Sequence, residues 1–281
     1  MKKITSQAIT DAVSRLCVVA NTHLRLDIKR ALEDAIKKED NDRAGSILKQ
    51  LLENARIAKG DMVALCQDTG MPIVFVDIGR GIDVSGIDIA EAVNKGVEEG
   101  YRRGYLRDSI IDDPLVRQER TSSAPCVIHF DFGSHKGLKV TVLPKGFGCE
   151  NKTQLKMFNP TVPIREIKDF IVSVVKNAGP DACPPYTLGI GIGGTADYAS
   201  LLSKKALLRP VGRHNKLKHV AELEEELYRT LNKLNIGPMG LGGRTTVLGV
   251  NILTYPTHMA GLPVAVNISC HVLRSASVIL K

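Results

Sequence analysis

The stretch Cys183-Pro-Pro-Tyr-Thr-Leu-Gly-Ile-Gly-Ile-Gly-Gly-Thr195 decides the fold that the sequence predicts. The short apolar run from Leu188 to Ile192 is typical of a buried strand, and the glycine pair after it indicates a turn. The following residues, about 196–208, have the apolar spacing of a helix. A strand, a glycine turn and a helix in this order are typical of an α/β fold.

The segments on either side continue this alternation. The runs 126–132 and 138–143 resemble a strand pair joined by a Gly-Ser-His-Lys-Gly turn. Other strands are predicted at residues 72–79, 245–253 and 263–269, and other helices at residues 88–105, 164–177 and 218–234.

The first 60 residues have a different pattern, because three helices are predicted there with no strand between them. They begin near Thr5 or Ser6, near Asp27 and near Asp42, and Gly60 is a natural end of the third. The sequence therefore predicts a helical N-terminal region, residues 1–60, followed by an α/β domain, residues 61–281, with β-sheets flanked by helices.

The composition is that of an ordinary globular protein, with 281 residues, 43% hydrophobic and 24% charged. The net charge of +8 fits either an ordinary surface of solvated lysine and arginine or an anionic partner, which could be nucleic acid, a small anionic substrate or an acidic subunit. No zinc finger, RNP aromatic pattern or basic-region helix accompanies the charge, so we expect no nucleic-acid partner. No apolar run approaches about 18 residues and no signal peptide is recognisable, which predicts a cytoplasmic protein that does not contact a membrane.

The six cysteines are scattered and form no CxxC pair; they are Cys17, Cys66, Cys126, Cys149, Cys183 and Cys270. A reducing cytoplasm makes disulfides improbable, so a buried thiol in the core is the default interpretation of each. Three of them stand at the ends of apolar runs or before rigid prolines, where a chain could hold sulfur toward a cavity; these are Cys66, Cys183 and Cys270. Three thiolates would suffice for an iron–sulfur cluster with one open iron.

Four segments are rich in glycine and small polar residues and stand where strands should meet helices: CQDTG (66–70), KGFGCENKT (145–153), CPPYTLGIGIGGT (183–195) and GPMGLGGRTT (237–246). Ligands of open α/β sheets bind at such an edge. A dinucleotide site is an alternative, because Gly189, Gly191 and Gly194 match GxGxxG. No acidic residue follows about 20 positions later, which makes this match weak.

Six segments together resemble the class I fumarate hydratase and L-tartrate dehydratase family, in the same order and over about residues 60–275. They are CQDTG, GYLRDS (104–109), KGFGCENK, CPPYTLGIGIGGTAD, GPMGLGGRTTVLGV and THMAGLPVAVNISCH. The resemblance implies a 4Fe-4S cluster held by Cys66, Cys183 and Cys270, with a fourth iron left open for a small dicarboxylate. The family commonly has serine at the position of Cys149. That thiol is therefore either a fourth ligand or, the interpretation we favour, a residue beside the substrate.

The resemblance also implies the remaining site residues. Gln67, Arg107 and Gly148 are expected to bind the substrate, and Asp68 and His258 are expected to be catalytic. Without the resemblance, Arg107 would be a surface arginine, Asp68 a turn-capping residue and His258 a structural loop residue.

The implied reaction is the reversible hydration of fumarate to (S)-malate. The alternative within the family is dehydration of L(+)-tartrate to oxaloacetate, and the remote alternative is a metal- or nucleic-acid-binding protein without catalysis. Single-chain relatives are much longer, so the resemblance implies an α subunit that requires a separate β subunit, in an α2β2 assembly. The catalytic base is not evident in this chain.

Overall fold

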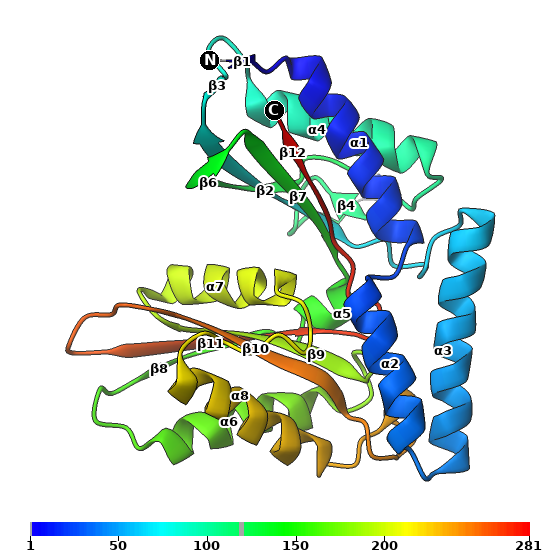
Figure 1. Ribbon diagram of the computed structural model, residues 1–281, viewed down its shortest axis with the longest axis vertical. Helices are drawn as coiled ribbons and strands as arrows, with labels where there is room; N and C mark the ends of the chain where they lie inside the picture. The colour runs from blue at the N-terminus through cyan, green and yellow to red at the C-terminus, as the bar shows by residue number, and fades with distance from the viewer. Residues whose placement is uncertain (1, 118–120) are drawn as a thin grey trace. The chain divides into compact units, whose positions relative to one another are not determined.

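The computed structural model describes residues 2–117 and 121–281, and the chain separates into two compact units (Figure 1). Unit 1 consists of Met1–Arg25, Asn54–Phe147 and Arg274–Lys281. Unit 2 consists of Leu26–Glu53 and Gly148–Leu273. Each unit has its own sheet and its own hydrophobic core.

The sheet of unit 1 has the strand order β12-β7-β2-β6. Its strands are β2 (Met71–Arg80), β6 (Val127–Lys136), β7 (Leu138–Lys145) and β12 (Ala276–Leu280). β2 pairs in parallel with β6 and antiparallel with β7, and β7 pairs antiparallel with β12. The central position of β2 agrees with its sequence, because residues 72–76 are all buried and apolar, as a strand covered on both faces requires.

Two helices of unit 1, α1 (Ser6–Thr22) and α4 (Ile89–Arg103), pack against each other, and α1 also packs against β7 and β12. Thr5 caps α1 through a hydrogen bond from Ala8 N, and Asp88 caps α4 through one from Glu91 N. Their apolar faces close the core over the sheet. Unit 1 also contains two short strand pairs, β1 (Lys2–Lys3) with β3 (Ile82–Asp83) and β4 (Ile110–Ile111) with β5 (Thr121–Ser122).

The sheet of unit 2 has the strand order β10-β9-β11-β8. Its strands are β8 (Gln154–Phe158), β9 (Tyr186–Gly193), β10 (Val247–Tyr255) and β11 (Leu262–Ser269). β9 pairs in parallel with β10 and antiparallel with β11, so the start of β9 and the end of β11 lie at the same edge of the sheet. In Figure 1, α7 (Ala196–Leu208) covers one face, while α6 (Ile164–Ala178) and α8 (Lys218–Asn232) cover the other.

The alternation of glycine and apolar residues in β9 follows from its two faces. Leu188 and Ile190 point into the core that contains the α6 and α8 side chains. Gly189 and Gly191 point toward α7, where an added Cβ would lie 2.1 Å from Ser203 O and 2.0 Å from Ala199 O, respectively. Only glycine permits this close packing of helix on strand. The glycines that resemble a dinucleotide motif therefore have a packing role.

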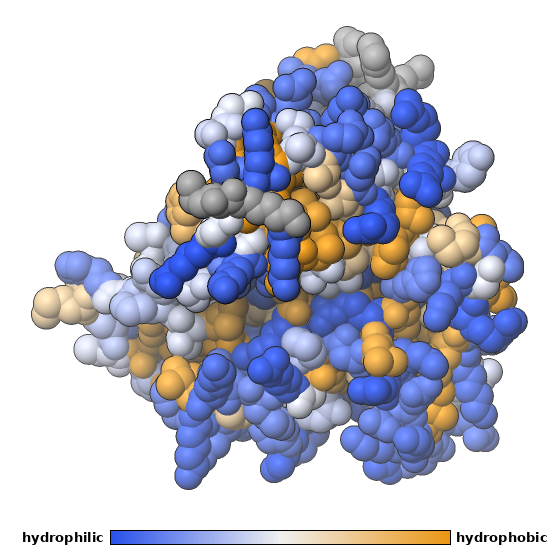
Figure 2. All heavy atoms as spheres, turned by 45° about the horizontal axis from the view of Figure 1, so that its top comes forward, coloured by the Kyte–Doolittle hydropathy of each residue, from blue (hydrophilic) through white to orange (hydrophobic). Residues whose placement is uncertain are grey.

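The other elements are the helices α2 (Leu26–Lys38), α3 (Asp42–Asp61) and α5 (Phe147–Glu150) and the 3₁₀ turn η1 (Pro238–Gly240). α2 contacts β10 within unit 2. Along residues 2–117 and 121–281, no helix is both long and apolar enough to cross a membrane. The face seen in Figure 2 is largely hydrophilic, with smaller hydrophobic areas between the polar side chains.

The predicted fold class, a helical N-terminal region followed by α/β structure with helices flanking β-sheets, is confirmed. The predicted hairpin of residues 126–132 and 138–143 is wrong, because β2 lies between β6 and β7 and pairs with both. The buried strand β2 gains ladder hydrogen bonds along both of its edges in this order. The compact units combine segments from both sides of residue 60. The division into a region of residues 1–60 and a domain of residues 61–281 stays a prediction.

Candidate functional site

The CQDTG loop, residues 66–70, leads into β2 and is held at its start by two asparagines. Leu65 N donates to Asn21 O at 2.8 Å, and the Asn54 side chain donates to Leu65 O at 3.0 Å. Asn21 itself is fully buried. The N–H and the carbonyl oxygen of Leu65, the residue before Cys66, are therefore both hydrogen-bonded.

Two further side chains fix the loop after Cys66. Arg274 donates to Asp68 O at 2.7 Å, and the Tyr101 hydroxyl lies 2.9 Å from Thr69 O and 3.1 Å from Gly70 O. Burial raises the pKa of Tyr101, so the hydroxyl stays protonated and remains a donor. Successive carbonyls of the loop thus have buried partners, which favours one backbone conformation.

The Asp68 carboxylate joins the CQDTG and KGFG segments. Asp68 Oδ1 accepts from Gly70 N and Oδ2 accepts from Phe147 N, both at 2.9 Å. The first bond is the Asx turn that an Asp-Thr-Gly sequence predicts, and the second reaches a residue 79 positions later. The predicted catalytic Asp68 is therefore also a structural acceptor in this conformation.

Of the predicted substrate-binding residues of unit 1, Gln67 lies in this loop and Arg107 lies beside it. Gln67 is exposed, and the Cys66 thiol donates to Gln67 Oε1 at 3.3 Å. Arg107 is exposed, and its carbonyl oxygen accepts from the Thr69 hydroxyl at 2.6 Å. The hydroxyl of Thr69 thus brings the GYLRDS segment against the CQDTG loop and leaves the guanidinium of Arg107 open to solvent.

In unit 2 the structure brings Cys183 and Cys270 to the same edge of the sheet. Cys183 precedes β9 and Cys270 follows β11, whose last residue, Ser269, pairs with Thr187. The carbonyl oxygen of Cys183 lies 3.4 Å from His271 N, which donates to it, and 3.2 Å from His271 Nδ1. A hydrogen bond therefore joins Cys183 to the residue immediately after Cys270.

The backbone of Cys183 has φ = +56°, in the left-handed region that non-glycine residues rarely adopt. Such a conformation costs of order 1–2 kcal/mol and persists where the surrounding structure imposes it. Here the backbone carbonyl of Cys183 is held by the His271 contact. An imposed conformation of this kind at a candidate ligand is consistent with a functional requirement on the direction of the thiol.

The six thiols fall into two groups by exposure. Cys66, Cys183 and Cys270 are partly exposed, whereas Cys17, Cys126 and Cys149 are buried. Burial raises the pKa of Cys126 to about 12 and also raises that of Cys17. These two thiols therefore stay neutral near pH 7, which agrees with their expected place in the core.

Cys149 contacts the residue before the predicted ligand Cys183, but Cys149 is buried whereas Cys183 is partly exposed. Cys149 is 5% exposed, belongs to the core of unit 2, and its thiol donates to Ala182 O at 3.3 Å. Gly148, beside it, is exposed, and an added Cβ there would meet only Asp181 O, at 3.9 Å. The Gly148 backbone is thus accessible, and its contact with the substrate stays a prediction.

The predicted catalytic residue His258 does not lie with the cysteines of unit 2. It occupies the exposed turn before β11, where its Nδ1 accepts from Ala260 N at 3.2 Å. Cys270 follows the other end of β11, and an eight-residue strand is roughly 23 Å long. Within unit 2, therefore, His258 and Cys270 stand at opposite edges of the sheet.

A polar network that the sequence analysis missed holds the KGFGCENKT segment. Lys204 of α7 forms a close ion pair with Glu150, and Asn267 of β11 donates to Glu150 Oε2 at 3.1 Å and to Thr153 Oγ1 at 2.8 Å. Asn267 is fully buried. The acidic residue of GFGCEN was the only available signal for this network.

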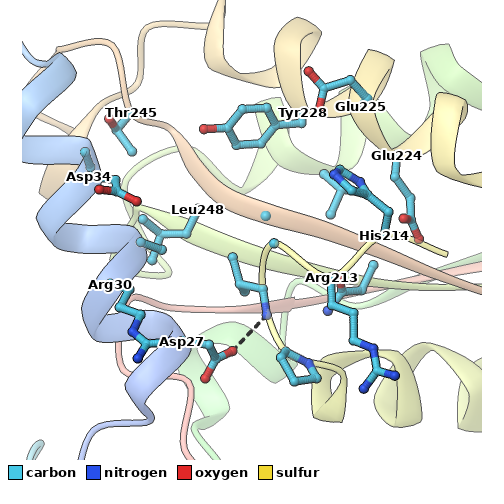
Figure 3. Close-up of a pocket in the computed structure, with 18 of the residues that line it drawn as sticks. Asp27, Arg30, Asp34, Arg213, His214, Glu224, Glu225, Tyr228, Thr245 and Leu248 are labelled. Carbon is cyan, nitrogen blue, oxygen red and sulfur yellow. Dashed lines mark hydrogen bonds between the residues drawn. The ribbon is translucent and has the colours of Figure 1, made fainter.

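Unit 2 also contains a cavity of about 400 Å³ formed by α2, α8, β10 and residues 210–214 (Figure 3). Asp27 accepts from Val211 N at 2.8 Å at its rim, and Glu224 is bonded to Arg209 and to Ile252 N. None of the predicted site residues lines this cavity.

The residues present fit a sulfur-ligated cluster in part. The three candidate thiols are the partly exposed ones, and two of them stand at one sheet edge, joined through His271. The third, Cys66, belongs to unit 1. In the part of the chain that the structure describes, no group of three or more His, Cys, Asp or Glu side chains lies together as a metal site.

Comparison with known proteins gives one family. The model of the family described as fumarate hydratase (Fumerase) matches residues 10–279. The putative L(+)-tartrate dehydratase subunit alpha of Methanocaldococcus jannaschii is 42% identical over 274 residues, which cover 95% of this chain and 96% of that protein. The L(+)-tartrate dehydratase subunit alpha of Escherichia coli K12 is 27% identical over 275 residues, covering 97% of this chain and 90% of that protein.

The match extends over nearly the whole chain and includes all six segments that carried the resemblance. The chain therefore belongs to the class I fumarate hydratase and L-tartrate dehydratase family, whose members are hydro-lyases.

Proposed function

We propose that this chain is the α subunit of an iron–sulfur hydro-lyase that reversibly hydrates fumarate to (S)-malate together with a separate β subunit. The observation that carries the proposal is the family match over residues 10–279. The names of the relatives from M. jannaschii and E. coli, both called subunit alpha, support the separate partner. An α2β2 assembly is part of the same proposal.

Cys66, Cys183 and Cys270 would hold the 4Fe-4S cluster, and the cytoplasm is its proposed location because cytosolic thiols are kept reduced. When bound, such a cluster with an open iron supplies a Lewis acid that makes hydroxide a better leaving group. The partial exposure of these three thiols supports the assignment.

The substrate contacts proposed for this chain are those of a dicarboxylate. The exposed guanidinium of Arg107 would bind one carboxylate in a bidentate manner, and the Gln67 side chain and Gly148 N–H would add polar contacts. Asp68, held by two backbone N–H groups, would orient the reacting groups. His258 stays a proposed catalytic residue, and the carbon-bound proton would be removed by a base from the β subunit.

The second candidate function is dehydration of L(+)-tartrate to oxaloacetate. It is favoured by the names of the relatives from M. jannaschii and E. coli, which are both called L(+)-tartrate dehydratase subunit alpha. (S)-Malate and L(+)-tartrate are both dicarboxylates and differ by one hydroxyl group, so the two reactions make the same demands on the cluster and on the carboxylate contacts. The cluster residues alone do not distinguish them.

The direct experiment is to assay the anaerobically prepared α–β complex with (S)-malate and with L(+)-tartrate, beside the α chain alone. The proposal predicts a higher kcat/KM for malate and no turnover by the α chain. A higher kcat/KM for tartrate would select the second candidate. Turnover of neither substrate by a cluster-loaded complex would overturn the proposed activity, and full turnover by the α chain alone would overturn the need for a partner.

A further inference from the structure

Arg274 is a charged side chain placed almost entirely out of water. It is 3% exposed, and its guanidinium donates to Asn21 Oδ1 at 3.0 Å and to Asp68 O at 2.7 Å. Burying a charge is unfavourable unless hydrogen bonds compensate for the lost water. The two hydrogen bonds of Arg274 therefore indicate which part of the chain its buried guanidinium stabilises.

Both contacts act on the same loop. Asn21, which accepts from Arg274 through its side chain, also accepts from Leu65 N through its carbonyl oxygen. Leu65 stands directly before Cys66, and Asp68 stands directly after Gln67. The Asn21–Arg274 pair thus holds the backbone on both sides of the Cys66-Gln67 dipeptide.

A guanidinium is suited to this arrangement. Its donors lie in one plane with fixed directions, so one group can bridge two acceptors and fix the distance between them. A lysine ammonium would keep the charge but would not hold both acceptors in a fixed geometry. The Tyr101 hydroxyl, bonded to the carbonyls of Thr69 and Gly70, supports the end of the loop independently.

We propose that Arg274 is a positioning residue which, with Asn21, fixes the direction of the Cys66 thiol and of the Gln67 and Asp68 side chains. It acts through the backbone of the CQDTG loop. The meaning of this direction for catalysis rests on the proposed function, whereas the restraint on the loop does not depend on it.

The test compares thiol reactivity in the full-length, cluster-free chain. Iodoacetamide labelling of each cysteine would be followed by mass spectrometry in the wild type, in Arg274→Lys and in Arg209→Lys. Arg209 is a matched control, because it is a largely buried arginine of unit 2, bonded to Glu224 and Asn251. We expect Arg274→Lys to raise the labelling rate of Cys66 severalfold and to leave buried Cys17 and Cys149 protected, and Arg209→Lys to leave Cys66 unchanged.

A second variant and a second measurement make the result decisive. Asn21→Ala removes the amide that orients the guanidinium and should also raise the labelling of Cys66 selectively. In the α–β complex, Arg274→Lys should lower kcat by roughly 10- to 100-fold with little change in KM, because residues that support a ligand act at about this level. The electron paramagnetic resonance spectrum of the reduced cluster should change as well.

An unchanged labelling rate of Cys66 in both variants would overturn the inference. A parallel rise in all six thiols would also overturn it, because Arg274 would then stabilise the whole fold. Failure of the proposed function is distinguishable, since it would appear as an inactive wild-type complex, while labelling of the cluster-free chain requires neither substrate nor β subunit.

Discussion

The Cys149 thiol donates a hydrogen bond to the carbonyl oxygen of Ala182, 3.3 Å away, and Ala182 is the residue before the proposed ligand Cys183. Cys149 is thus a buried neighbour of a segment that carries a proposed ligand. This relationship gives the position a role in packing and in holding the backbone, and it favours the proposal of three protein ligands over that of four.

Replacing Cys149 by serine is therefore expected to preserve the cluster. The serine hydroxyl keeps a donor for Ala182 O, so the loss of stability should be limited to the cost of a more polar group in the core, about 1–3 kcal/mol. Iron content and visible absorbance of Cys149→Ser would be compared with the wild type. A colourless Cys149→Ser chain would show that the fourth thiol is a ligand after all.

Arg107→Lys is expected to weaken binding of the dicarboxylate in the α–β complex. Lysine keeps the charge but loses the bidentate geometry, and a hydrogen bond to a charged group contributes about 1.5–3 kcal/mol. The expected loss in kcat/KM is thus roughly 10- to 100-fold. Arg103→Lys, at the exposed end of α4, is the matched control and should behave as wild type. Equal kinetics of the two variants would remove Arg107 from the site.

Lys204→Met is expected to destabilise unit 2, because it leaves the Glu150 carboxylate without its cation. The side chains of Lys204 and Glu150 are 17% and 23% exposed, so solvent still reaches both. The free energy of unfolding should fall by about 1–3 kcal/mol, less than for a fully buried pair. The double variant Lys204→Met/Glu150→Gln should recover part of this loss. Denaturant unfolding measures the free energy of unfolding of the single and the double variant, with the exposed Lys29→Met as control. If the double variant loses as much stability as the two single changes added together, Lys204 and Glu150 are not coupled.

Alkylation of the cluster-free chain at increasing pH should distinguish the buried Cys126 from the partly exposed thiols by their rates of labelling. Cys126, whose pKa burial raises from 9.0 to about 12, is a neutral thiol at pH 8 and should stay unlabelled, unlike the exposed thiols. The Cys126 thiol ionises near pH 9 in the unfolded chain and near pH 12 in the native chain. The stability from a neutral, buried Cys126 is therefore present below pH 9 and lost as pH rises toward 12. Preferential labelling of Cys126 at pH 8 would contradict this.

Much of the fold was predictable because its signals are local. The apolar period of α6, α8 and β9 and the capping residues of α1 specify these elements in short windows. Strand order depends on distant pairings that short windows do not contain. The parallel pairing of β2 with β6 and the late strand β12 were therefore not predicted.

The candidate site shows the same limit. Its motifs were recognisable because cysteine, glycine and proline stand out in sequence, as at Cys183. The side chains that hold these motifs are ordinary polar residues far away in the chain, such as Arg274 for Asp68 and Asn267 for Glu150. Their importance arises from burial and from a specific partner, and neither is written in the local sequence.

The measurement that tests the central claim most directly is the iron and sulfide content of the anaerobically purified chain, with its visible absorbance, for the wild type and three variants. The wild type should carry about four irons and four sulfides per chain. Cys66→Ser, Cys183→Ser and Cys270→Ser should each lose the cluster while remaining folded. A wild-type chain that is colourless and stays free of iron after reconstitution, or serine variants that keep a full cluster, would contradict the account.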